Sequence, residues 1–268
     1  EILAHRILWS LLTMGILVVA LRRTAHLRRL FADDRVVRLL MLSAFVISIN
    51  WGTYIYGVNS GRVVETSLGY FITPLVTVLM GVLLLGERLR PLQWVAMGVA
   101  STAVCVLTWD YGRPPWIALV LALSFGTYGL AKKIADVGAV ESLTVETALV
   151  APFAGAYVVW LVATGASTFG AVGTGHALLM VSTGIVTAVP LICFGAAATR
   201  VSMVTLGLLQ YLAPVIQFML GVLFFREDMS TGRWAGFVLV WVALAIFTVE
   251  LVNHHRQLRL TVAASGAA

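Results

Sequence analysis

Charged residues are scarce in this sequence. Of the 268 residues, only 11% are Asp, Glu, Lys or Arg, whereas an ordinary globular domain has about 25%. Hydrophobic residues make up 60% of the chain. A water-soluble fold of this length could not bury so much apolar surface. The composition therefore excludes a soluble globular protein and indicates that lipid is the solvent.

Residues suited to metal, disulfide or catalytic chemistry are also few. The two cysteines, Cys105 and Cys193, lie inside apolar runs, and the five histidines lie at segment ends and in loops. None of these residues has the spacing of a metal site or a disulfide framework. The sequence contains no G-x-S-x-G or H-E-x-x-H motif and no Gly-rich phosphate loop. We therefore expect no enzyme activity, no metal and no cofactor.

Long apolar runs dominate the chain instead. Nine of them approach the roughly 20 residues that a helix needs to cross a bilayer. They do not alternate as barrel strands would, and a helix satisfies its backbone N–H groups within its own segment. The sequence therefore predicts an all-α polytopic membrane protein with nine transmembrane helices, at residues 2–21, 36–58, 64–85, 92–109, 115–133, 143–163, 177–199, 204–225 and 233–252.

Positive charge is distributed unevenly between the loops on the two sides of these runs. The loops after the first, third, fifth and seventh runs, together with the tail, hold 13 Lys and Arg residues, and the opposite side holds five. By the positive-inside rule, the C-terminus lies in the cytoplasm. Basic loops beside membrane spans indicate contact with anionic lipid rather than with nucleic acid.

One stretch of the sequence occurs twice, 140 residues apart and without a gap. Its shared positions are Pro74, Gly81, Glu87 and Trp94, which recur as Pro214, Gly221, Glu227 and Trp234. We expect the prolines to kink or loosen their helices and the glycines to admit a neighbouring backbone.

The same offset overlays the first four runs on the sixth to ninth, and only the run at 115–133 has no counterpart. This pattern predicts a 5+5 helix bundle that lacks its first helix. Residues 1–112 form the first repeat with four helices, 113–253 form the second with five, and 254–268 form a cytoplasmic tail. Because each repeat has an odd number of crossings, the second is inserted upside down relative to the first, as in many secondary transporters.

Several segments resemble the RarD branch of the EamA transporters, in the drug/metabolite transporter superfamily. They include "EILAHRILWS", "INWGTYIYGVNSGRVVETSLGYFITPL", "ERLRPLQW", "SFGTYGLAKK" and "TLGLLQYLAP". The resemblance covers residues 1 to about 252 and implies ten helices, cytoplasmic termini and export of small metabolites or drugs from bacteria. The branch also carries a name linked to chloramphenicol. This chain departs from the family pattern in lacking the first helix and in having Thr73 where asparagine often precedes the proline.

Polar and aromatic residues inside the apolar runs are candidates for a substrate cavity. An amide in the middle of a membrane helix needs a partner, which another helix or a water-filled cavity can supply. Interhelical hydrogen bonding, worth about 0.6 kcal/mol and at most about 2 kcal/mol, is the alternative interpretation. The cavity candidates are Asn50, Trp51, Tyr54, Tyr70, Thr73, Gln210, Tyr211 and Gln217.

A few charged residues also fall inside or close to the runs. Arg6 and Glu146 correspond in the repeat, each about one turn into its helix. Such side chains can snorkel to the interface, or they can serve coupling or gating, together with Pro74 and Pro214. Glu65 is expected to start a helix at the membrane surface, where the positive end of the helix dipole favours a carboxylate.

Taken together, these features predict a secondary transporter that exports small metabolites or drugs, including amphipathic or aromatic solutes, by alternating access across the bacterial inner membrane. The alternative is a channel, or a lipid or solute facilitator without active coupling. The expected partners are a small-molecule substrate and the lipid bilayer, not nucleic acid. The sequence makes no prediction of oligomeric state.

Overall fold

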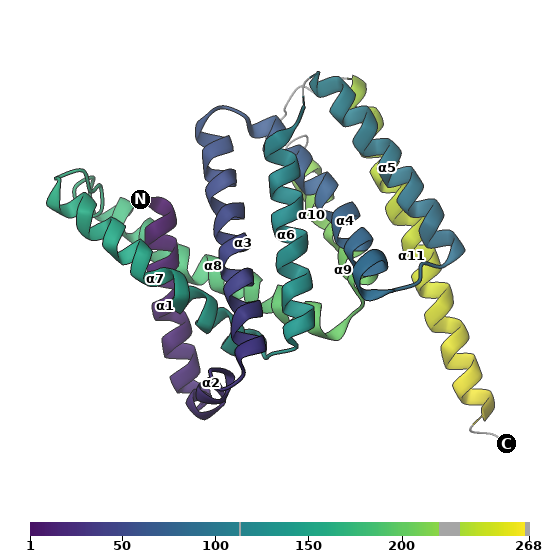
Figure 1. Cartoon of the computed structure of the whole chain (residues 1–268). Helices are drawn as coiled ribbons and strands as arrows, with labels where there is room; N and C mark the ends of the chain where they lie inside the picture. The colour runs from purple at the N-terminus through teal and green to yellow at the C-terminus, as the bar shows by residue number, and fades with distance from the viewer. Residues whose placement is uncertain (113, 220–230, 266–268) are drawn as a thin grey trace. The chain divides into compact units, whose positions relative to one another are not determined.

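The computed structural model describes residues 1–112, 114–219 and 231–265, and no β-strand occurs among them. Gly221 and Glu227 of the repeated stretch lie outside these residues. The helices in the described residues are α1 (Ile2–Ala20), α2 (Thr24–Leu30), α3 (Asp34–Asn59), α4 (Val63–Leu85), α5 (Pro91–Tyr111), α6 (Trp116–Ala135), α7 (Ala139–Ala163), α8 (Thr174–Arg200), α9 (Met203–Gln210), α10 (Leu212–Met219) and α11 (Thr231–Ser265) (Figure 1).

Seven of the described helices, α1 and α3 to α8, are long and apolar enough to cross a membrane. Two shorter apolar stretches, 203–216 and 234–250, lie in α9 to α10 and in α11. These helices confirm an all-α polytopic membrane protein. The single helix predicted from residue 204 is interrupted, because α9 ends at Gln210 and α10 begins at Leu212, shortly before Pro214.

Helix α4 runs without interruption through Pro74. The proline ring has no N–H to donate to the preceding turn. Threonine hydroxyls supply bonds to nearby carbonyls: Thr73 Oγ1 donates to the Gly69 carbonyl oxygen over 2.7 Å, and Thr77 Oγ1 donates to that of Thr73 over 2.9 Å. The helix ends at Leu85. The next residue, Gly86, has a φ of 68°, in the left-handed region that glycine adopts without strain.

The chain divides into two compact units, each made of two separate stretches. Unit 1 comprises residues 1–59 and 124–201, and unit 2 comprises residues 60–123 and 202–268. Helix α6 contributes to both, because the division falls within it. The core of unit 1 includes Met14, Trp51, Tyr128 and Leu143, and that of unit 2 includes Phe71, Val78, Ala96, Tyr211 and Phe247.

Three of the four sets of helices that the 140-residue offset equates pack on each other within these units; in the described part of the chain, α3 and α8 do not. The offset carries α1 onto α7, α4 onto α9 and α10, and α5 onto α11. In the structure α1 packs on α7, α4 packs on α9 and α10, and α5 packs on α11. The last pair lies side by side in unit 2 (Figure 1). Each compact unit therefore combines a stretch from each predicted repeat. The repeat boundaries themselves stay a prediction.

The paired helices run in opposite directions. Glu87, just after the C-terminal end of α4, accepts a hydrogen bond of 2.8 Å from the backbone N–H of Met203 at the start of α9. Arg23, just after the C-terminal end of α1, donates over 2.8 Å to Glu141 in the first turn of α7. A two-fold axis in the membrane plane relates helices in this antiparallel way.

Close backbone approach accompanies this packing. A Cβ atom added to Gly81 would lie 2.7 Å from Met203 Cβ, and one added to Gly207 would lie 2.8 Å from the Pro74 carbonyl oxygen. Real Cβ atoms do not approach so closely, so glycine is required where α9 crosses α4. The expected close approach at Gly81 is confirmed.

Candidate functional site

The predicted cavity residues are divided between the two units. Those of unit 1 lie on α3, and those of unit 2 lie on α4 and on α9 to α10. Their contacts are therefore described within each unit. The side chain of Gln217 lies outside the part of the chain that the structure describes. The unit 1 residues are Asn50, Trp51 and Tyr54, and the unit 2 residues are Tyr70, Thr73, Gln210, Tyr211 and Gln217.

In unit 1, the α3 residues contact two other helices. Asn50 Nδ2 donates to Ser124 Oγ of α6 over 3.0 Å. Trp51 is 7% exposed, and the Arg6 guanidinium of α1 lies over its ring, 4.4 Å from the centroid. Arg6 Nε also donates to Thr187 Oγ1 of α8 over 2.7 Å. A cation over an indole face is favourable, because the ring quadrupole is negative there. Arg6 is thus held inside unit 1 by two specific contacts.

In unit 2, polar side chains meet at the junction of α9 and α10. Thr77 Oγ1 lies 3.1 Å from Gln210 Oε1 and can donate to it. The Tyr211 side chain is 1% exposed in the apolar core. Among the residues that the structure describes, neither the Tyr211 hydroxyl nor Gln210 Nε2 has a hydrogen-bond partner. A buried polar group without a partner costs about 1–3 kcal/mol.

An ion pair that the sequence did not predict lies inside unit 1. Lys132 Nζ of α6 is 2.7 Å from Glu146 Oε1 of α7, and each side chain is 2% exposed. Lys132 lies at the end of the predicted span 115–133, and α6 continues to Ala135 with the lysine side chain buried rather than exposed. Snorkelling of Glu146 to the interface is wrong, because its side chain is enclosed by protein.

Hydrogen bonds to both charges complete this cluster. Ser43 Oγ of α3 donates to Glu146 Oε1 over 2.7 Å, and the Tyr128 hydroxyl of α6 donates to Oε2 over a longer 3.4 Å. Lys132 Nζ also donates to Ser142 Oγ. Removing one partner of a buried ion pair costs about 3–5 kcal/mol, because the remaining charge is uncompensated. The cluster therefore connects α3, α6 and α7, and its two charges depend on each other.

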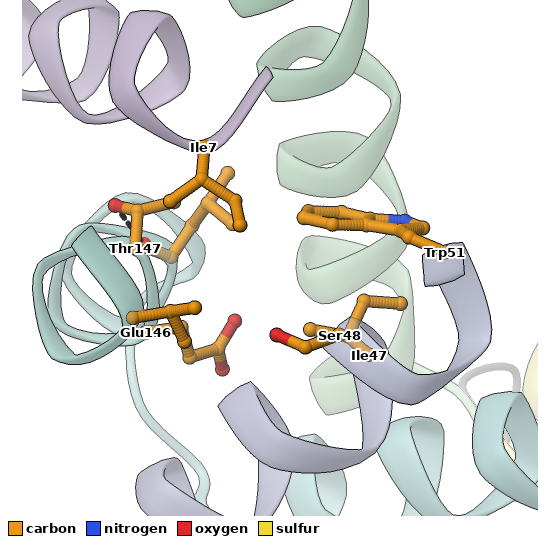
Figure 2. Close-up of a pocket in the computed structure, with 8 residues that line it drawn as sticks. Ile7, Ile47, Ser48, Trp51, Glu146 and Thr147 are labelled. Carbon is orange, nitrogen blue, oxygen red and sulfur yellow. Dashed lines mark hydrogen bonds between the residues drawn. The ribbon is translucent and has the colours of Figure 1, made fainter. Parts of the chain in front are cut away.

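A small hollow in unit 1 borders this cluster. It is a shallow depression that is partly open at the protein surface, with room for little more than a water molecule. Figure 2 shows the Glu146 carboxylate and the Ser48 hydroxyl turned towards each other across the hollow, with Trp51 and Ile7 beside them. Its walls are mainly apolar and are formed by Ile7, Ile47, Ser48, Trp51, Leu143, Glu146, Thr147 and Val150.

Other carboxylates hold helix ends rather than line the hollow. Glu65 is 1% exposed, and its Oε1 accepts the backbone N–H of Ile117 over 2.8 Å, at the start of α6. The expected helix start is confirmed, because Glu65 lies in the first turn of α4, and its carboxylate also binds the N-terminus of the neighbouring helix α6, where the helix dipole favours a negative charge. Glu87 does the same for α9, where its two oxygens accept the N–H groups of Met203 and Val204 over 2.8 Å each.

The carboxylate of Glu1, ahead of α1, binds the segment after α7. Burial by itself would raise its pKa. Hydrogen bonds from the side chain and backbone of Thr168, the side chain of Ser167 and the backbone of Phe169 outweigh this effect and lower the pKa from 4.5 to about 2. On the other side of the same helix pair, the hydrogen bond and charge of Glu141 raise the pKa of Arg23.

The sequence contained a partial signal for the missed residues. Lys132 and Tyr128 are four residues apart on α6, and so they share a face. That face is buried because α7 supplies Glu146 next to it, and hydropathy gives no information on which helix lies beside α6. Among the residues that the structure describes, no group of three or more His, Cys, Asp or Glu side chains could hold a metal ion.

Taken together, the fold and these sites define a multi-pass α-helical membrane protein with polar and charged groups placed between its helices. The model of the EamA-like transporter family matches residues 1–109. Protein RarD of Streptomyces exfoliatus is 58% identical over 259 residues, which are 97% of this chain and 82% of that protein. An uncharacterized transporter of Pseudomonas aeruginosa is 42% identical over 261 residues, which are 96% of this chain and 87% of that protein.

The chain belongs to the EamA family, in its RarD-type branch, and is a membrane transporter. One solved crystal structure matches with a TM-score of 0.64 at 19% identity, covering 92% of this chain and 87% of that one. At this identity the match concerns the fold alone.

Proposed function

We propose that the protein is a secondary transporter that exports small metabolites or drugs by alternating access across the bacterial inner membrane. The observation that carries this proposal is the antiparallel packing of α1 on α7 and of α4 on α9, helices that the repeat equates. Inverted repeats give a transporter two nearly equivalent packings, one open to each side of the membrane. A static pore needs no such pair.

Amphipathic or aromatic solutes, such as chloramphenicol-like compounds, are the proposed substrates. Trp51 and Tyr54 offer aromatic surface, and Gln210 and Tyr211 offer polar groups that have hydrogen-bonding capacity to spare. Asn50, Tyr70, Thr73 and Gln217 complete the proposed set. Pro74 and Pro214 are proposed for gating, since Pro74 removes a backbone hydrogen bond inside α4 and Pro214 lies in the first turn of α10, just after the break at Tyr211.

Counterflow in liposomes tests the transport mechanism. Purified protein is reconstituted, the liposomes are loaded with unlabelled chloramphenicol or an aromatic metabolite, and entry of the labelled compound is followed after dilution. A carrier that alternates between two states gives transient accumulation of label above equilibrium, because internal solute returns the carrier for the next molecule. Equilibration without overshoot, together with unitary conductance steps in a planar bilayer, would favour the channel or facilitator instead.

A further inference from the structure

The ion pair of Lys132 and Glu146 is difficult to explain by stability alone. Buried ion pairs can often be replaced by apolar side chains of similar volume without loss of stability, because desolvation offsets their attraction. Ionisable groups inside membrane segments are instead associated with ion or substrate pathways. Both side chains are 2% exposed, and both lie in helices long and apolar enough to span the membrane. A functional role is therefore the better explanation.

The two oxygens of Glu146 are bound unequally. Oε1 lies 2.7 Å from Lys132 Nζ and accepts the Ser43 hydroxyl over 2.7 Å. Oε2 has the Tyr128 hydroxyl at 3.4 Å, which is long for an O–H···O bond. Glu146 also lines the hollow that is partly open to the outside (Figure 2). This carboxylate thus combines a fixed ionic partner on one oxygen with a weakly bound second oxygen and a place in the wall of the hollow.

We propose that Glu146 is a proton-binding site reached through the hollow, and that its ion pair with Lys132 is the contact that the proton weakens. This inference rests on the proposed secondary transport and gives it a coupling ion. A proton from water binds Oε2 and converts the carboxylate into a neutral carboxyl group. The charge of the pair then changes from zero to plus one, and loss of the proton restores it.

Lys132 keeps two other contacts when Glu146 is neutral. Its ammonium donates to Ser142 Oγ and lies 5.1 Å from the centroid of the Tyr128 ring. The ionic link between α6 and α7 is weakened at that moment, whereas the bond from Ser43 can persist. Protonation therefore changes how α6 is held against α7, which is the kind of change that can bias a two-state packing.

The other groups near the cluster define its charge balance. Helix α6 contributes Tyr128 in addition to Lys132, and α3 contributes the neutral Ser43 and Ser48. From α8, the neutral Phe194 ring stacks on Tyr128. From α1, Arg6 lies on Trp51, which lines the hollow.

Infrared difference spectroscopy tests the proton site without a substrate. Wild-type protein in lipid nanodiscs is titrated between about pH 8 and about pH 4, a range that covers perturbed carboxyl groups, and the C=O stretching band of protonated carboxyl groups is recorded. Exposed carboxyl groups also contribute to this band near pH 4, and so we expect one component of the band that appears on acidification and is lost in Glu146→Gln. The matched control is Glu65→Gln, which removes another buried carboxylate, in unit 2; it should retain this component.

Failure to fold would not obscure this result. If Glu146→Gln leaves Lys132 uncompensated and unfolds the protein, the double variant Glu146→Gln with Lys132→Gln removes both charges and should lack this component. Absence of the component from the wild type, or its persistence in the folded variant, overturns the proposal. Counterflow is measured on the same wild-type preparation. A titrating Glu146 without counterflow contradicts the proposed transport mechanism, whereas counterflow without a titrating Glu146 contradicts only the proton site.

Discussion

Glu1 and Glu141 are separated by the 140-residue offset of the repeat, and each carboxylate binds the segment that follows the other one's helix. Glu1 accepts the backbone N–H groups of Thr168 and Phe169, which follow α7. Glu141 accepts a hydrogen bond from Arg23, which follows α1. Corresponding residues thus make corresponding contacts at the two ends of one antiparallel helix pair, as a local two-fold axis requires.

Neutralising Glu1 should alter the acid sensitivity of the protein. Its pKa is lowered to about 2, so the folded state favours the carboxylate. The resulting stabilisation is fully present above pH 4.5, the ordinary pKa, and is lost as the pH falls towards about 2. Glu1→Gln should lower the melting temperature at neutral pH by about 2–4 °C and should flatten its fall on acidification. Asp136→Asn, at an exposed carboxylate after α6, is the control that keeps the wild-type pH profile.

Removing the charge of Glu87 should weaken the attachment of α9 to α4. Both carboxylate oxygens accept backbone N–H groups of α9, from Met203 and Val204. A glutamine has one oxygen and would turn its NH₂ group towards the second N–H. Glu87→Gln should therefore destabilise the protein by about 1.5–3 kcal/mol, the range for hydrogen bonds to charged groups, in thermal unfolding monitored in detergent. Arg88→Gln changes an exposed neighbour; an equal effect from it would contradict this assignment.

A methyl group at Gly207 should force α9 away from α4. Its Cβ would lie 2.7 Å from the side chain of Val78 and 2.8 Å from the Pro74 carbonyl oxygen. The carbonyl belongs to the backbone and cannot rotate away, so Gly207→Ala should cost about 1–3 kcal/mol, as overpacking does. The control is Gly98→Ala in α5, where a Cβ meets nothing within 4 Å. It should keep or raise the melting temperature, because alanine favours the helix by about 1 kcal/mol over glycine.

Hydropathy was sufficient to predict the fold class, because the bilayer fixes the length of an apolar span. It could not predict the interruption at Tyr211, since the apolar run continues through that position. The repeat equated α4 with α9, but it gave no information on their contact. That contact depends on the shape of Gly207 against Pro74, which appears only in three dimensions.

The candidate site was less accessible to sequence analysis. A charge in an otherwise apolar run is read as the end of a span, and for this reason Lys132 was placed at a helix end with no partner assigned to it. Its burial depends on Glu146, on the next helix, and the distance between their charged atoms of 2.7 Å follows from helix packing. A hydropathy scale includes the unfavourable transfer of a charge into the membrane. It does not include the ionic or hydrogen-bonding partner that another helix supplies.

The orientation in the membrane can be tested with a reporter that is active only in the periplasm. The excess of 13 Lys and Arg residues over five places the loop at 86–91 and the C-terminus in the cytoplasm. The reporter should therefore be silent when fused within 86–91 or after Ala268, and active when fused within 164–176. Western blotting of each fusion controls for expression. The reverse activity pattern would contradict the orientation and the proposed export direction.

Asn50 offers a choice between a solute contact and an interhelical contact. Its Nδ2 donates to Ser124 Oγ over 3.0 Å, which joins α3 to α6 within unit 1. If this bond is its main role, Asn50→Ala and Ser124→Ala should each lower stability by about 0.6–2 kcal/mol.

A double-mutant cycle isolates the pair, because the double variant should lose less than the sum of the single variants if the two side chains interact. Solute affinity is measured on the same folded preparations, with Tyr54→Ala as the comparison on the same helix face. A loss of one hydrogen bond to the solute should raise its dissociation constant by about three- to twelvefold. Additive stability effects together with such a loss of affinity in Asn50→Ala would contradict the interhelical role and assign the amide to the solute.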